Sequence, residues 1–408
     1  MRHQSMKYLA SSSQTKKNEK LSLVLDVGTT GVHGCVFDDR LELRAKAYQL
    51  LSKNVHGLCV EQDPREILNT SISVLKKCIR EVGVSVSSIA TFGMTNQRET
   101  VIAWDRVSGK PLCPAIVWED RRTAKECQLL RRKHETVVRE KTGLPILPYF
   151  SASKMAWILK QVPLASNALS KGRLAIGTVD SWILWNFLEG HPLVTDYTNA
   201  SRTLLFNIRT LAWDNELLNL FNIPRSILPD VFPSQHVFGV LKKSLFGSAI
   251  PVNAVCGDQQ ASMAAAGVKK GTTKITYGTG TFIMQSIGSR FSVQPHFFTT
   301  LLPSSGKAIY ALEQKVEGSG EKTQGLLNHP VKLRAYLQKL AEQVQRHVAE
   351  LPQKPQRLIV DGGVSRDGIV AECQEKVSRI PVRRQKIIDG TSLGVAMLLQ
   401  QYIKMKGE

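Results

Sequence analysis

Residues 21–37 read LSLVLDVGTTGVHGCVF: an apolar run, a short turn of glycine and threonine at 28–31, and a second apolar run. Short apolar runs bounded by glycine are typical of strands, so the stretch predicts a strand, a turn and a second strand. The turn offers backbone N–H groups and hydroxyls to the phosphates of a nucleotide, and Asp26 can hold magnesium through water. Taken alone, such a turn is more often an ordinary hairpin.

A second stretch has the same layout at 273–284, where TYGTGT at 276–281 separates two strand-like runs. Two such turns, one in each half of the chain, predict a duplicated fold whose nucleotide lies between the halves. Near the C-terminus, LIVDGGV at 358–364 predicts a buried strand that ends in two glycines, where the backbone can approach an adenosine closely. The repetition favours phosphate binding over unrelated hairpins.

The polar turn TNQRET at 95–100 joins strand-like runs at 88–94 and 101–104. The Arg98 guanidinium supplies several fixed donors and the Glu99 carboxylate supplies acceptors, a combination that suits the hydroxyls of a small polyol. The turn therefore predicts a substrate clamp. The alternative is a solvated turn with a weak surface ion pair.

Helix signals occur between these turns and after them. The sequence Asp63-Pro64-Arg65-Glu66 predicts a helix start, with Asp63 as the N-cap, Pro64 at the first position and Glu66 closing a capping box. Apolar periodicity and charge predict further helices from about residue 121, near 332–350 and near 392–402.

Length, hydropathy and cysteines narrow the class of protein. A chain of 408 residues predicts two domains of roughly 200 residues each, with a cleft between them. No run reaches the ~18 apolar residues of a membrane-spanning helix. The seven scattered cysteines contain no CxxC pair, which disfavours a disulfide framework and a zinc site. We therefore expect a cytoplasmic protein with reduced thiols, for which a homo-oligomeric state is open.

The net charge of +20 attracts anionic partners. The basic runs are short and lack interleaved aromatic residues, so we do not expect nucleic acid to be that partner. Residues 1–20 are basic, rich in serine and contain one acidic residue, which predicts a disordered tail. A transit peptide for an organelle is the alternative for this segment.

Seven stretches occur in an order that is typical of one family. They are DVGTT (26–30), TNQRET (95–100), AIVWEDRRTA (115–124), TGLPILPYFSASK (142–154), TVDSWILW (178–185), TDYTNASRTLLFNI (195–208) and CGDQQAS (256–262). In this order they resemble the FGGY family of carbohydrate kinases, most closely its glycerol-phosphorylating members, over about residues 21–402. Several motifs in a fixed order are far more specific than one glycine pattern.

The resemblance implies a fold and a reaction. The fold is a two-domain α/β architecture of the actin-like, hexokinase-like (ribonuclease H-like) ATPase type, with the active site in the interdomain cleft. The implied first domain, 21–250, carries the substrate site and the first phosphate turn. The implied second domain, 251–408, is shortened and carries the second phosphate turn and the adenosine site. The implied reaction is phosphorylation of glycerol to glycerol 3-phosphate with ATP and Mg²⁺.

The resemblance also implies roles for single residues. Asp258 is the general base that takes the proton of the attacking hydroxyl; the alternative for this carboxylate is a cap on a helix that begins near Gln259. Glycerol is bound by Arg98, Glu99, Trp118, Tyr149, Asp258, Gln259 and Phe282, with the rings of Trp118 and Phe282 against its carbon face. The nucleotide is bound by Thr29, Thr30, Gly278, Thr279, Gly320, Gln324, Gly362, Gly363 and Asp367, and the magnesium shell is held by Asp26.

The chain departs from the family in its second half. The stretch QKVEGSGEK at 314–322 is polar where the family usually has an apolar helix, and the long segment that the family has after Leu327 is absent. Asp367 stands where the family often has an asparagine, and its carboxylate would repel a phosphate at close range. These departures leave two alternatives open: a sibling kinase for another polyol or a sugar such as xylulose or gluconate, and a non-catalytic relative that binds polyol or nucleotide without turnover.

Overall fold

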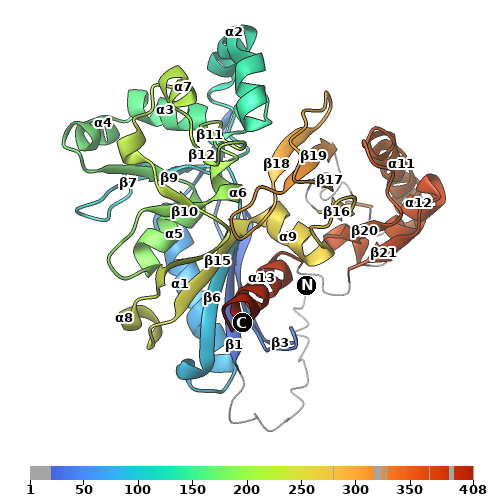
Figure 1. The fold of residues 1–408 in the computed structure, drawn as a ribbon, viewed down its shortest axis with the longest axis horizontal. Coiled ribbons are helices and arrows are strands. Elements are labelled where there is room, and N and C mark those ends of the chain that lie inside the picture. The colour runs from blue at the N-terminus through green and yellow to red at the C-terminus, as the bar shows by residue number, and fades with distance from the viewer. Residues whose placement is uncertain are drawn as a thin grey trace.

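The structure is a computed structural model that describes residues 20–278, 280–316, 323, 325–326, 329–366, 368–385 and 390–407. It contains two six-stranded sheets, and the second lies to the right of the first in the view of Figure 1. The tail predicted at 1–20 lies outside the described residues except for Lys20.

The first sheet contains β14 (Gln235–Val240), β15 (Pro251–Gly257), β6 (Ile89–Asn96), β1 (Leu21–Val27), β2 (Gly31–Phe37) and β3 (Leu43–Leu50), in this spatial order. β1 runs antiparallel to β2 and parallel to β6, and β6 is parallel to β15. Both strands predicted in the opening stretch are confirmed. The N–H of Gly28 donates to the carbonyl of Gly31 at 3.0 Å and closes the turn between them.

Five of the six strands of the second sheet repeat this arrangement. The sheet contains β18 (Phe298–Leu301), β19 (Tyr310–Val316), β17 (Thr281–Gly288), β16 (Thr273–Tyr277), β20 (Leu358–Asp361) and β21 (Val382–Arg384), in this spatial order. β16 runs antiparallel to β17 and parallel to β20, and the pairs β17–β19 and β20–β21 match β2–β3 and β6–β15 in direction. The duplication predicted from the two glycine–threonine turns is confirmed in the sheet topology.

Further helices and strands form the connections of the first half. They are β4 (Asn54–His56), β5 (Cys59–Gln62), η1 (Val86–Ser88), β7 (Ile102–Asp105), β8 (Ala115–Ile116), α2 (Ala124–Thr142), α3 (Ser151–Gln161), α4 (Pro163–Ser170), β9 (Leu174–Gly177), α5 (Val179–Phe187), β10 (Val194–Asp196), α6 (Tyr197–Ala200), β11 (Phe206–Asn207), β12 (Ala212–Trp213), α7 (Asn215–Leu220), η2 (Arg225–Ile227), β13 (Asp230–Phe232) and α8 (Lys243–Phe246). The strand predicted at 101–104 is β7, which pairs with β9 and not with the first sheet.

Helix α1 (Pro64–Glu81) packs on β2 and β3. Its predicted start is confirmed, because the Asp63 carboxylate accepts from the N–H of Arg65 at 2.8 Å and Pro64 occupies the first position. The predicted capping box is wrong. The Glu66 carboxylate accepts from the N–H and the hydroxyl of Ser52, both at 3.0 Å, and thereby fixes the neighbouring loop instead of the helix end.

In the second half, α11 (Pro330–Ala349) and α12 (Ile369–Ser378) lie beside each other, and both contribute to the hydrophobic core of the second sheet. The short η3 (Gly363–Ser365) follows β20.

None of the helices in the described part of the chain is both long enough and apolar enough to cross a membrane.

Two helices connect the halves of the molecule. α9 (Asp258–Ala266) follows β15, and α13 (Gly390–Gly407) packs against α9 and against β1, β6 and β15 of the first sheet (Figure 1). The contact is close at Gly394, where a Cβ atom would lie 1.8 Å from the carbonyl oxygen of Ala261. The domain division at residue 250 stays a proposal, and the membership of β15 in the first sheet argues for a later boundary.

Candidate active site

The parallel strands of the first sheet end at one edge, and several predicted site residues follow directly after them. Val27, Asn96 and Gly257 are register neighbours at the ends of β1, β6 and β15. The first phosphate turn, the Arg98–Glu99 turn and Asp258 therefore begin side by side. Ligands of α/β sheets bind at the carboxyl ends of the strands, so this edge is the candidate site.

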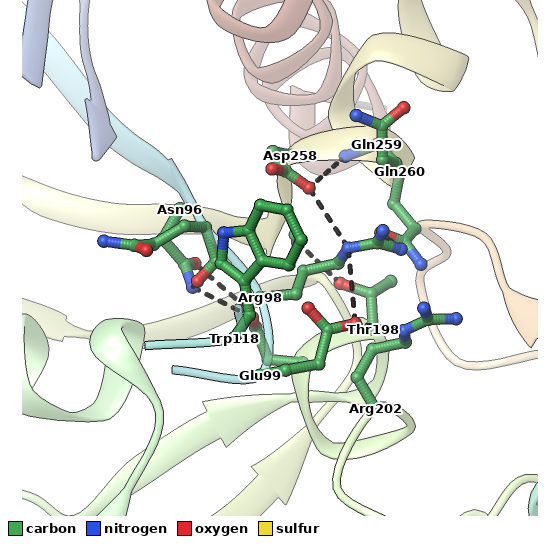
Figure 2. A network of polar contacts seen from close by, with 12 residues as sticks. Asn96, Arg98, Glu99, Trp118, Thr198, Arg202, Asp258, Gln259 and Gln260 are labelled. Atoms are coloured by element: carbon green, nitrogen blue, oxygen red, sulfur yellow. Dashed lines mark hydrogen bonds and ion pairs between the residues drawn. The ribbon is translucent and has the colours of Figure 1, made fainter. Parts of the chain in front are cut away.

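Arg98 lies in a buried cluster of charged side chains at this edge and is only 3% exposed. Its Nη1 and Nη2 atoms donate to the two carboxylate oxygens of Glu313, both at 2.9 Å. Its Nε lies 3.1 Å from Asp258 Oδ1 and 3.8 Å from Glu99 Oε1, contacts that are dashed in Figure 2. Because Arg98 and Glu99 are both buried, the alternative of a solvated surface pair is wrong.

Sequence analysis misses two members of this cluster, Arg202 and Glu313. Arg202 is fully buried, its Nε donates to Glu99 Oε1 at 2.6 Å, and its Nη atoms lie 3.3 and 3.4 Å from the Glu313 carboxylate. Arg202 stands in the family-like stretch at 195–208, which is the signal that could have found it. In the sequence, Glu313 follows Arg98 by 215 residues and Arg202 by 111 residues, and no local sequence pattern relates residues so far apart.

The backbone at Glu99 is strained. Its φ is +64°, and the N–H of Thr100 donates to the carbonyl of Arg98 at 2.8 Å, which are the features of a γ-turn with positive φ. A residue other than glycine in this region costs about 1–3 kcal/mol, and such strain gathers at functional sites. The turn lets two adjacent side chains, Arg98 and Glu99, reach the same buried cluster.

Charge and burial shift the pKa values of two carboxyl groups in the cluster, Glu313 and Asp258. Burial acts to raise the pKa of Glu313, but the Arg202 and Arg98 guanidinium groups outweigh it and lower this pKa to about 2. Burial raises the pKa of Asp258 to about 6, against the attraction of Arg98. The Asp258 side chain keeps 30% exposure, so it can be reached by a substrate. A carboxylate with a pKa near 6 is suited to accept a proton at neutral pH.

The capping alternative for Asp258 describes part of its environment. Asp258 is the first residue of α9, and its Oδ1 accepts from the N–H of Gln259 at 2.6 Å. The same carboxylate also faces Arg98, which a purely structural cap would not need. Gln259 points toward the second sheet, because its Oε1 accepts from the Thr276 hydroxyl at 3.5 Å.

An aromatic wall joins the substrate residues to the first phosphate turn. The Trp118 indole N–H donates to the Thr29 hydroxyl at 2.9 Å, and this hydroxyl donates to Gln97 at 3.2 Å. The Trp118 and Tyr149 rings meet edge to face, with their centroids 5.5 Å apart. Phe282, in β17, makes no ring contact with Trp118 in the described part of the chain, so its place against a substrate stays a prediction.

Two basic side chains contact the Tyr149 region, one at the Tyr149 ring and one at the backbone carbonyls. The Arg202 guanidinium lies 5.9 Å from the centre of its ring, and the Lys154 ammonium donates to the carbonyls of Pro148 and Tyr149 at 3.1 and 2.7 Å. Burial raises the pKa of the Tyr149 hydroxyl and lowers the pKa of Lys154 to about 8. Tyr149 therefore stays neutral at physiological pH and can donate a hydrogen bond to a substrate oxygen.

The predicted nucleotide residues lie at the ends of β1, β16 and β20. Thr30 is exposed, Thr29 and Gly278 are half-buried, and Gly363 is exposed. Gly362 has a φ of +92°, and a Cβ there would lie 2.3 Å from the carbonyl oxygen of Tyr277, so only glycine fits between the two turns. Thr279, Gly320, Gln324 and Asp367 lie outside the described residues.

A cavity of about 670 Å³ opens beside Gly362. Four arginines from the second sheet and its loops line it: Arg357, Arg366, Arg383 and Arg384. Arg384 Nη1 donates to the carbonyl of Arg366 at 2.9 Å and so holds one side of the cavity together. The cavity therefore offers positive charge next to the predicted adenosine turn.

The groups around Asp26 fit a magnesium ion bound through water. Asp26 is buried at the end of β1, and the Thr391 hydroxyl donates to its carboxylate. The Asp26 carboxylate and the Thr391 hydroxyl both offer oxygen, which magnesium prefers. No group of three or more His, Cys, Asp or Glu side chains suited to a metal occurs among the described residues. Magnesium typically keeps several waters and binds through one or two carboxylates and substrate phosphates.

The chain is similar in sequence to known carbohydrate kinases. The N-terminal domain model of the FGGY family of carbohydrate kinases matches residues 21–265. Glycerol kinase 2 of Thermotoga maritima is 43% identical over 316 residues, which are 75% of this chain and 63% of that relative. The chain thus spans less than two thirds of the length of this relative. A glycerol kinase of Deinococcus radiodurans is 35% identical over 438 residues, covering 92% of this chain and 87% of the relative.

The alignment with the Deinococcus protein is longer than the 408-residue chain itself, so it includes positions at which this chain has no residue. This agrees with a segment that is absent here. Among solved structures, the glycerol kinase of Plasmodium falciparum with ADP matches with a TM-score of 0.88 at 26% identity, over 95% of this chain and 90% of that one. The two chains share one fold.

Proposed function

Because the chain belongs to the FGGY family of carbohydrate kinases, whose fold is the two-domain actin-like architecture, we propose that it transfers the γ-phosphoryl group of ATP to glycerol. The products are ADP and glycerol 3-phosphate. The observation that carries the proposal is the position of Asp258, which contacts the buried arginine cluster at the sheet edge that also carries the first glycine–threonine turn, with a pKa of about 6.

The proposed reaction is an in-line displacement. A glycerol hydroxyl attacks the γ-phosphorus, the bond to the ADP oxygen breaks, and Asp258 takes the hydroxyl proton. Backbone N–H groups of the two glycine–threonine turns stabilise the phosphate charge. A magnesium ion held at Asp26 through water would neutralise further charge on the phosphates.

The hydrogen bonds of the cluster refine the proposed role of Arg98. A guanidinium has five N–H groups; Glu313 and Gln260 engage three of them, and Asp258 faces the fourth, at Nε. One N–H remains for a glycerol hydroxyl. Glu99 uses Oε1 to accept from Arg202, and none of the hydrogen bonds among the described residues includes its Oε2. Oε2 is therefore the proposed acceptor for a second hydroxyl.

A coupled assay of the purified protein with ATP, magnesium and glycerol tests the proposal. We expect ADP to form only when the acceptor is present. The same assay with xylulose and gluconate tests the sibling-kinase alternative, which predicts a higher kcat/KM for one of the sugars. The non-catalytic alternative, favoured by the missing segment, predicts ATP binding by calorimetry without product from any acceptor.

A further inference from the structure

A pair of buried side chains is hydrogen-bonded to the peptide that comes directly before Asp258. The N–H of Gly257 donates to the Thr198 hydroxyl at 2.8 Å, and this hydroxyl donates to the Asp196 carboxylate, whose oxygens lie at 2.8 and 3.0 Å. We propose that Asp196 and Thr198 are positioning residues, which fix Asp258 against Arg98 for proton transfer. This role rests on the kinase function proposed above.

The geometry of β15 explains why the Gly257 peptide needs a side-chain partner. The N–H groups of Val255 and Gly257 point to the same side of the strand. The N–H of Val255 donates to the carbonyl of Ser234 at 2.9 Å, and β14 begins only at the next residue, Gln235. The N–H of Gly257 thus lies beyond the end of β14, and the Thr198 hydroxyl takes the place of a strand carbonyl. A buried N–H without a partner would destabilise the fold.

The surroundings of Asp196 set the direction of these hydrogen bonds. Asp196 is fully buried, and its two carboxylate oxygens accept from the N–H groups of Thr198 and Asn199, both at 2.9 Å, and from the Ser234 hydroxyl at 2.6 Å. Burial raises the pKa of Asp196, and these hydrogen bonds oppose the rise. An ionised carboxylate can only accept, so the Thr198 hydroxyl donates to it and keeps its lone pairs for the N–H of Gly257.

A second set of hydrogen bonds connects Asp196 to the strand that leads to Arg98. The Asn199 amide donates to Asp196 Oδ1 at 2.9 Å and to Asn96 Oδ1 at 3.2 Å, and the Asn96 amide donates back to Asn199 Oδ1 at 3.0 Å. Asn96 is the last residue of β6 and the register neighbour of Gly257 in β15. One carboxylate is therefore connected to the ends of both strands, the one before the base and the one before its guanidinium partner.

The contact between Asp258 and Arg98 is sensitive to small displacements. A Cβ atom at Gly257 would lie 2.7 Å from Cγ and Cδ of Arg98, so this peptide packs directly on the arginine side chain. Among the charged groups that face Asp258, Arg98 lowers its pKa, and Glu99 and Glu313 raise it. A longer distance from Asp258 to Arg98 Nε, now 3.1 Å, would therefore raise this pKa and misplace the base. A misplacement of about 1 Å can lower a rate ~10²-fold.

The test removes the hydroxyl and keeps the shape of the side chain. We expect Thr198→Val to lower kcat with glycerol ~10–10²-fold. The acidic limb of kcat/KM should move from about pH 6 to higher pH, so that the loss is larger at pH 6 than at pH 8. Thr198→Ser keeps the hydroxyl and restores both quantities.

Thr91→Val is the matched control. Thr91 is also buried, near the start of β6, and its hydroxyl donates to Asn253 Oδ1 at 2.8 Å. This variant should lower the melting temperature as Thr198→Val does and leave the acidic limb in place. Ser234→Ala is a milder variant for the case that Thr198→Val does not fold. It removes one donor to Asp196 and should shift the acidic limb in the same direction by less.

A titration of the Asp258 carboxyl in the free protein separates this role from the proposed function. The carboxyl carbons of aspartate are labelled with carbon-13, and Asp258→Asn identifies the signal by NMR. We expect Thr198→Val to raise the titration midpoint of Asp258 and Thr198→Ser to restore it. If no acceptor is phosphorylated but the midpoint still rises, the kinase proposal fails and the positioning role stands. If neither Thr198→Val nor Ser234→Ala moves the midpoint, or if Thr91→Val moves it as far, the positioning role is overturned.

Discussion

At the scale of single residues, Asp258 must be ionised and yet basic enough to take a proton. Burial beside the Arg98 cluster raises its pKa to about 6, so at pH 7 it is mostly ionised and more basic than a free carboxylate.

Asp258→Asn removes the proposed base without changing the size of the side chain. We expect kcat to fall by ~10²–10⁴ while the melting temperature stays close to that of the unaltered protein. In the unaltered protein, kcat/KM is expected to fall about tenfold per pH unit below pH 6, because Asp258 becomes protonated. Steady-state kinetics across pH measure both effects, with the exposed Asp39→Asn as the control. An Asp258→Asn protein that keeps most of its activity would remove Asp258 from the role of base.

Arg98→Ala leaves the buried Glu313 with Arg202 as its remaining guanidinium partner. Breaking a buried ion pair from one side costs about 3–5 kcal/mol, so we expect a large loss of stability in chemical denaturation as well as weak glycerol use. The surface pair Arg225–Asp230, at 2.8 Å, supplies the control, and Arg225→Ala should cost about 0–1 kcal/mol. Equal costs for the two variants would contradict the buried network.

The Glu313 carboxyl also gives the cluster an acid dependence. Its pKa in the folded state is lowered from 4.5 to about 2. A lowered pKa stabilises the fold above pH 4.5, and this contribution is lost as the pH falls from about 4.5 toward 2. Denaturation midpoints measured between pH 5 and pH 3 should therefore converge for the unaltered protein and Glu313→Gln, and parallel curves would contradict this.

At the scale of elements, the contact between α9 and α13 positions the proposed base. Asp258 opens α9, and Gly394 in α13 allows the two helix backbones to approach so closely that no Cβ fits. The clash of such a Cβ would be with backbone atoms of Ala261, which cannot rotate away as a flexible side chain can. The position of Asp258 therefore depends on a glycine far away in the sequence.

Gly394→Ala is expected to push α13 away from α9, because its methyl group would overlap the Ala261 carbonyl. Overpacking of this kind costs about 1–3 kcal/mol or more, and kcat should fall together with the melting temperature as Asp258 moves. The control is Gln401→Ala on the exposed side of the same helix, which should change neither quantity. A Gly394→Ala protein with unchanged stability and activity would show that α9 and α13 can accommodate the added methyl group.

The sequence predicts individual strands, turns and helix starts better than it predicts the contacts between them. The strands of the opening stretch, the start of α1 and the glycine–threonine turns follow from patterns within a few residues of each other, and the structure contains them. The hydrogen-bond partner of Glu66 does not follow from such a local pattern. The Glu66 carboxylate accepts from Ser52 and not from the N–H groups at the helix end. The pairing of Glu313 with Arg98 and the place of α13 on the first sheet depend on contacts across most of the chain, which no local pattern encodes.

At the scale of the whole molecule, both sheets contribute to the candidate site, because Glu313 of the second sheet binds Arg98, and the sequence predicts that the second half is shortened relative to the family. The resemblance implies that the segment absent after Leu327 belongs near the base of the nucleotide, while both glycine–threonine turns are present in the sequence. The four arginines around the cavity beside Gly362 add positive charge at the same end. The molecule is therefore expected to hold a nucleotide more by its phosphates than by its base.

ATP and GTP are expected to bind within about tenfold of each other, or ~1.4 kcal/mol. Their affinities should fall as salt rises, because screening weakens the attraction of a protein with a net charge of +20. Calorimetry with ATP, GTP and tripolyphosphate at two salt concentrations measures this, and adenosine alone controls for the base. Tight binding of ATP that is strongly preferred over GTP and indifferent to salt would show a complete adenosine pocket.

The position of α13 has a consequence for how the protein folds during its synthesis. The ribosome makes β1 early and α13 only after both sheets, yet Val24 of β1 and Val395 of α13 belong to one buried cluster. Until α13 emerges, one face of the first sheet keeps its apolar side chains in water, and such surfaces are prone to aggregation. A chain that stops before α13 would therefore expose this apolar face and would leave α9, which carries Asp258, without the helix that packs against it.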